Sequence, residues 1–320
     1  MIESFVTAFS GTLGAMASIF LVIVIAGLLV RRGIIGQNQI DGLSAATVNV
    51  FLPCLIFSKV LQTLDPVALP RWWVLPLVGI LMALAGTGLG ALAFVGKLPE
   101  KRAMLPLAGM QNAGYLVLPV GLALFPDGFD TFALYCFLFI LGYNPVLWSL
   151  GKMLVSTGGG RSSGWRGLLT PPLLANLIAI IFALIGAGEV LPRPFLQAVD
   201  ILGTAAVPVA TLVLGAVLGS ISVRIRRYLG DAARAVSIKL LVLPALTVAV
   251  LHITRLHGSN PLLAEFLVIE AAAAPAVALV LQVRTYGGDE QRVGSVMFLS
   301  YLACTVTLPA WVAVWSLLSR

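Results

Sequence analysis

Apolar runs long enough to cross a lipid bilayer recur along the whole chain, and only short polar gaps separate them. A transmembrane α-helix needs about 20 mostly apolar residues to span the hydrocarbon core. Only 10% of the 320 residues are charged, whereas a soluble domain has about 25%, and the mean hydropathy is +1.03. These values exclude a soluble globular protein and predict an all-α polytopic membrane protein.

Clusters of charged residues, proline and glycine divide the chain into ten predicted transmembrane helices. They cover residues 5–30, 41–62, 72–96, 102–124, 129–153, 170–188, 195–221, 232–253, 261–283 and 290–318. Only Glu3 is charged before the first apolar run, so this run lacks the basic region that begins a signal peptide. We therefore expect it to stay in the protein as the first transmembrane helix.

Positive charge alternates between the predicted loops. The loops after helices one, three, five, seven and nine contain 14 Lys and Arg residues, against four on the opposite side, at Arg71, Arg193, Arg255 and Arg320. Cytoplasmic loops carry the excess of Lys and Arg. Both termini are therefore predicted to face the periplasm or the outside, with the protein in the cell inner membrane. This topology also accounts for the net charge of +7, and we expect no nucleic-acid partner.

The glycine-rich connector at residues 155–167 divides the helices into two sets of five, at residues 1–154 and 168–320. Because five is odd, the two sets must cross the membrane in opposite directions, as in an inverted repeat. Prolines recur in matching helices of the two halves. They are Pro53 and Pro208 in the second helices, and Pro119 and Pro275 in the fourth. The sequence predicts two inverted five-helix repeats joined by a cytoplasmic linker.

Two predicted helices carry an element that disfavours a continuous α-helix. Helix four contains GMQNAGYLVLP and helix nine contains IEAAAAPAVAL. Proline removes a backbone donor and clashes with the preceding turn, and hydrocarbon cannot satisfy the polar groups that a break exposes. Transporters with inverted repeats place paired broken helices at the bilayer midplane, where the dipoles of the half-helices face the substrate. Gln111, Asn112 and Tyr115 then lie beside the break; in the alternative interpretation they only join neighbouring helices.

Ionisable residues inside a span cost at least ~2.5 kcal/mol to insert and are candidates for function. Glu270 lies one helical turn before Pro275. It either carries a coupling proton, helps to bind sodium, or pairs with a lysine. Lys59 and Lys239 lie in helices two and eight. Their side chains either extend to the membrane surface or point inward, where they would attract an anionic substrate or neutralise Glu270.

Other polar or reactive side chains have simpler interpretations. Cys54, Cys136 and Cys304 lack the spacing of a metal or redox site and are interpreted as packing residues. The GTGLG stretch follows no strand, so it permits close helix packing rather than dinucleotide binding. No serine or aspartate dyad and no cluster of metal-ligating residues stands out in the spans, so neither an enzyme nor a cofactor is expected.

Six stretches in both halves carry a family resemblance. They are GLLVRRGIIG, VNVFLPCLIFSKV, QNAGYLVLP, AAVPVATLVLGA, AAAAPAVALVLQVRTYGGDE and LSYLACTVTLPAW. Together they resemble the auxin efflux carrier family, within the superfamily of bile acid/sodium symporters. The chain departs from the plant members in lacking their long central loop and in having Gln111, where they have a proline, before Asn112.

The resemblance implies a scaffold of helices one, two, six and seven, which forms a homodimer. It also implies a transport domain of helices three to five and eight to ten, with helices four and nine crossing at the substrate site. On this chain the crossing falls at Gln111 and Asn112 and at Ala274 and Pro275. Further candidates for the walls of the site are Asn49, Pro53, Thr204 and Pro208 on the scaffold, and Asn144 and Ser300 on helices five and ten.

The expected function is secondary transport of a small organic anion, a carboxylate such as an auxin-like acid or a dicarboxylate. The transport domain would move against the scaffold in an elevator-type alternating access. One alternative is a symporter of another small solute coupled to sodium or protons, with sodium near Glu270. A second alternative is a membrane sensor built on a transporter-like fold.

Overall fold

The computed structural model describes residues 2–157 and 169–319. Within these ranges the chain forms helices and no β-strand, and its single β-type pairing is an isolated bridge between Gln111 and Pro275. Seven helical segments are long and apolar enough to cross a membrane, which confirms the all-α, polytopic expectation. Residues 158–167 of the predicted linker lie outside the described residues.

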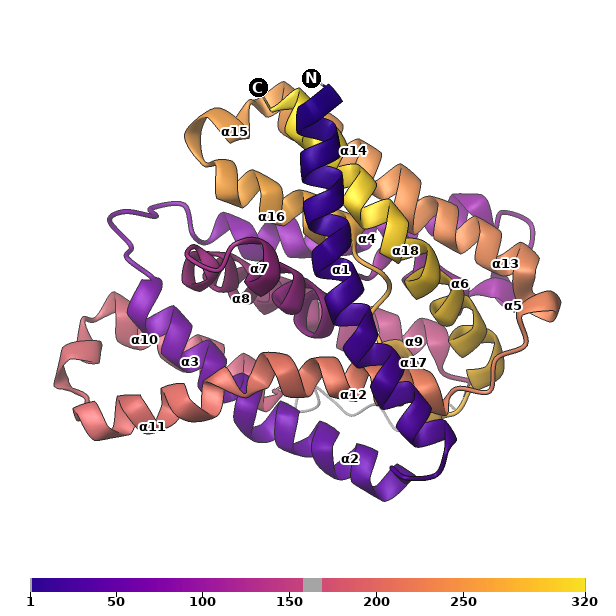
Figure 1. Ribbon diagram of the computed structural model, residues 1–320, viewed down its shortest axis with the longest axis horizontal. Helices are drawn as coiled ribbons and strands as arrows, with labels where there is room; N and C mark the ends of the chain where they lie inside the picture. The colour runs from indigo at the N-terminus through magenta and orange to yellow at the C-terminus, as the bar shows by residue number, and fades with distance from the viewer. Residues whose placement is uncertain (1, 158–168, 320) are drawn as a thin grey trace.

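Figure 1 shows the order of the elements in space. The α-helices are α1 (Ile2–Arg31), α2 (Gln37–Ala46), α3 (Leu52–Thr63), α4 (Val74–Ala93), α5 (Leu98–Lys101), α6 (Met104–Gly109), α7 (Leu118–Leu124), α8 (Phe129–Val146), α9 (Lys152–Val155), α10 (Pro171–Leu184), α11 (Arg193–Thr204), α12 (Ala206–Ser220), α13 (Ile225–Ser237), α14 (Leu243–Thr254), α15 (Leu256–Ser259), α16 (Pro261–Ala272), α17 (Ala278–Tyr286) and α18 (Glu290–Leu318). The π-helical turns are η1 (Thr47–Phe51), η2 (Ala113–Val117), η3 (Leu147–Gly151) and η6 (Ile238–Val242), and η5 (Ala187–Val190) is a 3₁₀ turn. The count of ten spans stays a prediction, because several apolar helices are shorter than a bilayer crossing requires.

Three of the π-helical turns stand directly before a Leu-Pro pair at the start of an α-helix. The prolines are Pro53, Pro119 and Pro244. A proline has no N–H to donate, and its ring clashes with the carbonyl of the preceding turn. A wider turn, with bonds from residue i to i+5, accommodates the ring without ending the helix. These prolines therefore widen their helices locally instead of breaking them.

Glycines bring the helices of the core close together. On α4, a Cβ atom at Gly86 would lie 2.5 Å from the Cα of Gly109 in α6, and one at Gly90 would lie 2.9 Å from the Cβ of Ala108. Gly88, which lies between them, has no neighbour within 4 Å. Small residues let membrane helices approach each other closely. The packing role predicted for GTGLG is therefore confirmed.

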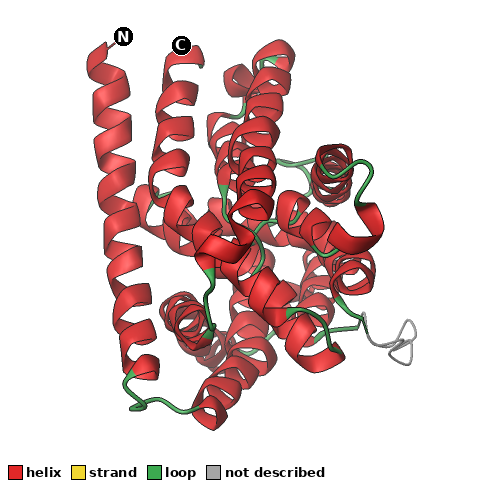
Figure 2. Cartoon of the chain, turned by 90° about the vertical axis from the view of Figure 1, so that its right-hand side faces the viewer, coloured by secondary structure: helices red, strands yellow, loops and turns green. Residues whose placement is uncertain are grey.

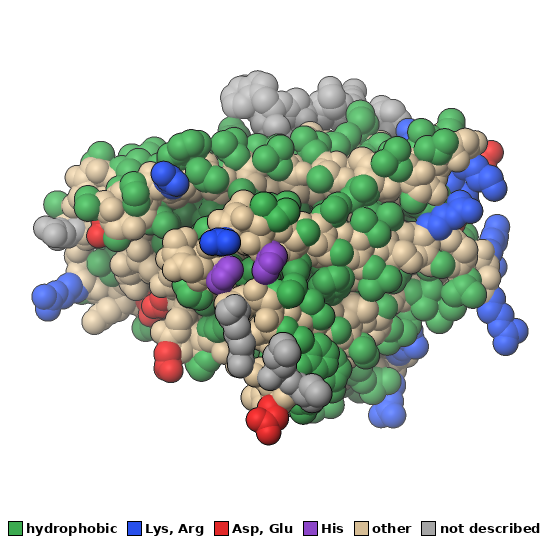
Figure 3. Space-filling model, turned by 90° about the horizontal axis from the view of Figure 1, so that it is seen from above, with side chains coloured by type: hydrophobic (Ala, Val, Ile, Leu, Met, Phe, Trp, Pro, Cys, Tyr) green, Lys and Arg blue, Asp and Glu red, His purple; other side chains and the backbone are tan. Residues whose placement is uncertain are grey.

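Both ends of the chain lie on the same side of the molecule, at the top of Figure 1 and of Figure 2. Hydrophobic side chains cover most of the face seen in Figure 3, and Lys and Arg side chains gather toward its right-hand end. Large apolar side chains are exposed on several helices, such as Leu81 at 65% and Ile253 at 78%. Such exposure is costly in water and favourable in lipid.

Candidate functional site

Two apolar segments of the chain are interrupted in the interior of the molecule. In the first, α6 ends at Gly109 and η2 begins at Ala113. In the second, α16 ends at Ala272 and α17 begins at Ala278. The cause is local in both cases, because proline in the second segment cannot donate to a helix and an asparagine in the first acts as an N-cap.

The two interruptions lie against each other; residues 110–112 and 273–277 are called the paired interruption below. The amide of Asn112 donates to the carbonyl of Ala274, and the amide of Ala276 donates to the carbonyl of Met110, each at 2.9 Å. These two bonds form the antiparallel bridge between Gln111 and Pro275. Each interruption therefore satisfies backbone groups of the other that hydrocarbon would leave unpaired.

Two buried tyrosines bind the carbonyls at the centre of the bridge. The hydroxyl of Tyr143 in α8 donates to the carbonyl of Gln111 at 2.6 Å. The hydroxyl of Tyr301 in α18 donates to the carbonyl of Pro275 at 3.1 Å and accepts a bond from the Nδ2 of Asn112 at 2.5 Å. Each tyrosine comes from the helix that follows the interruption in its own half of the sequence, so the two halves complete the site in the same way.

Two buried thiols bind further carbonyls beside the paired interruption. The Sγ of Cys136 donates to the carbonyl of Ala113 at 3.4 Å, and that of Cys304 donates to the carbonyl of Ala272 at 3.5 Å. Both cysteines are free. The interpretation of these cysteines as packing residues was therefore incomplete, because they also act as weak donors to backbone groups that the breaks expose.

A cavity of about 200 Å³ lies at the paired interruption. Its lining includes the first residues of both restarted helices, Ala113 and Gly114 in η2 and Ala278 in α17, together with Ala276. Gln111, Asn112 and Tyr115 also line it, and most of the rest of the wall comes from η1, α3, α8, η3 and the start of α10. This part is mostly apolar, with Asn144, Tyr143, Trp148 and Thr170 as its polar members. The first amides of a helix have no partner inside it and carry the positive end of its dipole. The cavity therefore has the backbone features of an anion site.

The family described as "Membrane transport protein" matches residues 12–163 and 159–312. The chain belongs to this family. An "Uncharacterized transporter" of Methanothermobacter thermautotrophicus is 26% identical over 314 residues, which cover 96% of this chain and 99% of that protein. The family match confirms the resemblance to auxin efflux carriers and makes this chain a membrane transport protein.

The structure of this membrane transport protein brings several predicted site residues together. Gln111, Asn112, Tyr115 and Asn144 line the cavity, and Ala274 and Pro275 lie in the paired interruption. Asn112 also caps η2, because its Oδ1 accepts from the amide of Tyr115 at 3.3 Å. The sequence predicted these residues because polar groups and a proline are conspicuous in apolar spans, except for Ala274, whose place at the crossing was implied by the family resemblance.

Other predicted residues lie away from the cavity. The Nδ2 of Asn49 donates to the carbonyl of Ala45 in its own helix and the residue is exposed. The hydroxyl of Ser300 donates to the carbonyl of Val296, and that of Thr204 donates to the carbonyl of Ile201. Pro53 and Pro208 are also absent from the lining of this cavity.

The pairing of Pro119 with Pro275 was wrong in register. The bridge joins Pro275 to Gln111, whereas Pro119 follows η2 at the start of α7. Proline positions alone did not distinguish a break from a widened turn, because both structures relieve the same clash.

Sequence reasoning missed Tyr143 and Tyr301. A tyrosine buried in an apolar span needs a partner for its hydroxyl, and that signal was available for both residues. Ser300 was chosen instead of its neighbour, and a shift of one residue turns a side chain by about 100° around a helix. The error is therefore one of helical phase within the correct helix.

The ionisable residues of the spans have different surroundings. Glu270 is fully buried; its Oε1 lies 3.9 Å from the Sγ of Cys136, and its Oε2 has no hydrogen-bond partner in the part of the chain that the structure describes. Lys239 is also fully buried, and its Nζ donates to the carbonyl of Ala271 at 2.6 Å. The alternative in which Lys239 reaches the membrane surface was wrong, because η6 directs the side chain to the end of α16.

Lys59 has acidic partners of its own. Its Nζ lies 2.9 Å from Asp130 and 3.7 Å from Asp200, and its side chain is 13% exposed. The alternative in which Lys59 neutralises Glu270 was therefore wrong. Among the described residues, no group of three or more His, Cys, Asp or Glu side chains has the arrangement of a metal site.

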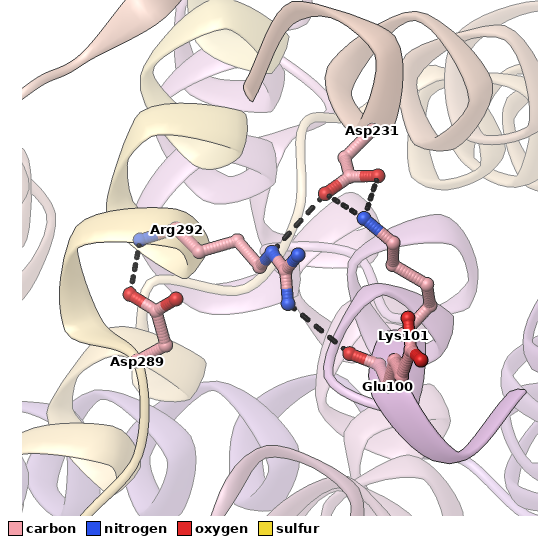
Figure 4. A network of polar contacts seen from close by, with 5 residues as sticks. All are labelled: Glu100, Lys101, Asp231, Asp289 and Arg292. Atoms are coloured by element: carbon pink, nitrogen blue, oxygen red, sulfur yellow. Dashed lines mark hydrogen bonds and ion pairs between the residues drawn. The ribbon is translucent and has the colours of Figure 1, made fainter. Parts of the chain in front are cut away.

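A charged network joins three elements far from the cavity (Figure 4). Lys101 in α5 lies 2.7 Å from Asp231 in α13, and the Nε of Arg292 in α18 lies 3.1 Å from the same carboxylate. The guanidinium of Arg292 also donates to the carbonyl of Glu100, and its amide donates to Asp289. Asp231 thereby binds two cations, and it joins the middle of α13 to the end of α5 and the first turn of α18.

Proposed function

We propose that this membrane transport protein is a secondary transporter of a small organic anion, and that the carboxylate binds at the paired interruption. The observation that carries the proposal is the cavity at the first residues of η2 and α17. Two helix N-termini directed at one small cavity each contribute a partial positive charge of about half an elementary unit. None of the described residues that line it is charged, so no carboxylate in the wall would repel an anion.

The shape and polarity of the cavity fit a small carboxylic acid. Its polar lining lies around Asn112, Tyr115 and Asn144, while Leu52, Ile56 and other apolar side chains form the opposite wall. A carboxylate can accept bonds from the amides while an apolar body contacts the wall. A volume of about 200 Å³ limits the substrate to a small solute.

Helix contacts support an inverted repeat, which alternating access requires. In the proposed repeat α1 corresponds to α10, and α12 corresponds to α3. Contacts occur between α1 and α12 and between α10 and α3, and likewise between α4 and α8 and between α13 and α18. Both chain ends lie on one side of the molecule (Figure 2), which an even number of crossings would produce.

In this proposal the protein has two units. The scaffold unit contains α1–α3 and α10–α12, and the transport unit contains α4–α9 and α13–α18. The network around Asp231 lies entirely within the transport unit, so it would keep the ends of that unit together during movement. The proposed cycle is an elevator, in which the paired interruption moves with the transport unit along the scaffold.

The membrane potential favours one direction of transport. With a negative interior, a monovalent anion gains about 2.3 kcal/mol per 100 mV on leaving the cell, so efflux needs no coupling ion. A second candidate function is a symporter that takes up its solute together with a proton or a sodium ion. The observation that favours this candidate is Glu270, a fully buried carboxylate whose Oε2 has no hydrogen-bond partner among the described residues.

The test is counterflow in proteoliposomes with a panel of mono- and dicarboxylates, under imposed proton, sodium and voltage gradients. We expect at least one carboxylate inside the vesicles to accelerate uptake of its labelled form. Transport of a cation or a neutral solute, with every carboxylate inactive, would contradict the proposal. A dependence on voltage alone supports uncoupled efflux, and a dependence on a proton or sodium gradient supports the second candidate.

A further inference from the structure

The C-terminal end of α16 lies in the interior of the molecule and gathers negative charge. The last carbonyls of a helix have no partner inside it and carry the negative end of its dipole. Glu270, one residue before Ala271, adds a buried carboxylate whose Oε2 has no hydrogen-bond partner within residues 2–157 and 169–319. Half-helix C-termini with exposed carbonyls bind coupling cations in transporters of this general architecture. Oxygen ligands of this kind suit a small hard cation.

An ammonium group already occupies this position. The Nζ of Lys239 donates to the carbonyl of Ala271 at 2.6 Å, and the side chain is fully buried. Glu270 is the residue directly before Ala271, and among the described residues no ion pair within 4.0 Å joins it to Lys239. The lysine comes from η6, a π-helical turn, and such turns are frequent at functional sites.

The carbonyls at the end of α16 need hydrogen-bond donors, but these donors do not have to be charged. The neighbouring carbonyl of Ala272 is bound by a neutral donor, the thiol of Cys304, at 3.5 Å. Burying an ammonium is costly unless charge compensates it, and the end of α16 together with Glu270 provides that compensation. What Lys239 adds beyond a hydrogen bond is therefore a positive charge held at the carbonyl of Ala271.

We infer that the ammonium of Lys239 is a tethered cation, which fills a site for a small monovalent cation at the end of α16. The protein then binds no sodium beside Glu270, and removal of the lysine side chain opens a sodium site formed by Glu270 and the carbonyl of Ala271. The inference about the cation site stands on these contacts. Its consequence for transport, which is independence from sodium, rests on the proposed function.

The experiment is thermal unfolding of the purified protein in sodium chloride and in potassium chloride at equal ionic strength. We expect wild type to melt at the same temperature in both salts. Lys239→Ala should show a saturable rise in melting temperature that sodium produces and potassium does not. The double variant Lys239→Ala/Glu270→Gln should lose this rise. Lys59→Ala is the matched control, because Lys59 pairs with aspartates elsewhere, and it should respond to both salts alike.

Equal melting of folded Lys239→Ala in the two salts would overturn the inference. If Lys239→Ala does not purify as a monodisperse protein, binding of radioactive sodium to wild type tests whether sodium binds beside Glu270. Absence of saturable binding supports the tethered cation, and saturable binding that Glu270→Gln removes overturns it. These measurements need no substrate, so a failure of the proposed function would appear only in the counterflow assay.

Discussion

Asn112 makes three different contacts in the paired interruption. Its amide donates to the carbonyl of Ala274, its Oδ1 accepts from the amide of Tyr115, and its Nδ2 donates to Tyr301. The side chain thereby caps η2 and at the same time binds α18 to the start of η2. A side chain with these contacts sets the geometry of the cavity even where it does not touch the substrate.

We predict that Asn112→Ala strongly slows counterflow while the protein stays folded. Each buried group left without a partner costs about 1–3 kcal/mol, which corresponds to a loss of about 5- to 150-fold in transport. Asn49→Ala is the matched control, because Asn49 is exposed and bonds only to its own helix. Undiminished counterflow with folded Asn112→Ala would show that Asn112 is not part of the substrate site.

Tyr301→Phe tests the tyrosine that the sequence did not reveal. The substitution deletes one hydroxyl and leaves both the carbonyl of Pro275 and the Nδ2 of Asn112 without their partner. We expect a fall in melting temperature equivalent to about 1–3 kcal/mol and slower counterflow. Tyr286→Phe serves as the control, because its ring contacts Lys152 and the hydroxyl has no partner among the described residues. Equal effects of the two substitutions would refute the role of Tyr301.

Residue chemistry predicted part of the site. Gln111 and Asn112 are conspicuous in an apolar span, and a polar group there needs a partner. The burial of Lys239 was not predictable in the same way, because a long side chain near the end of a span can also reach the surface. The choice between a buried Lys239 and one that reaches the membrane surface depends on the π-helical turn η6, which is a feature of the folded backbone.

At the scale of elements, the apolar runs predicted helices that can cross a membrane, and seven segments of the described chain are long and apolar enough to do so, because bilayer thickness determines how long such a run must be. The interruptions lie in the predicted helices, and their bridge joins Gln111 to Pro275, within the crossing that the family resemblance implied; only the matching of Pro119 with Pro275 was out of register. Backbone pairing between residues 110–112 and 273–277 depends on two segments far apart in sequence, and local patterns contain no information on that pairing. The π-helical turns before Pro53 and Pro244 were missed for the related reason that proline permits several local solutions.

Two glycines on α4 give a matched test of helix packing. Gly86→Ala would place a methyl group 2.5 Å from the Cα of Gly109, whereas Gly88→Ala meets nothing within 4 Å. We expect Gly86→Ala to destabilise the protein by about 1–3 kcal/mol, as overpacking does, and to displace α6 at the paired interruption. Gly88→Ala should leave the melting temperature unchanged or raise it. Similar melting of both variants would contradict the close contact of α4 with α6.

At the scale of the whole molecule, Lys59 links the two proposed units. Lys59 in α3 and Asp200 in α11 belong to the scaffold unit, and Asp130 in α8 belongs to the transport unit. If the transport unit moves, the bond to Asp130 breaks while Asp200 stays close. Ser58 also binds Asp200, at 2.7 Å, and keeps that alternative partner in place.

We predict that Asp130→Asn shifts the balance between the two ends of the transport cycle. Both aspartates are substantially exposed, so the pair contributes at most about 1 kcal/mol and the shift is about fivefold or less. Fluorescence energy transfer between labels on α3 and α8 measures it. Asp127→Asn is the control, since Asp127 is exposed and has no ion pair in the described chain. If the distribution of distances between the labels is the same in Asp130→Asn as in wild type, the ion pair between Lys59 and Asp130 does not influence the transport cycle.

The most direct measurement is a structure determined with a transported carboxylate bound. The account predicts the solute in the cavity at the paired interruption, with its carboxylate within hydrogen-bond distance of the first amides of η2 or α17, near Gly114 and Ala278. A solute bound elsewhere would contradict it. So would continuous, separate helices over residues 104–124 and 261–286.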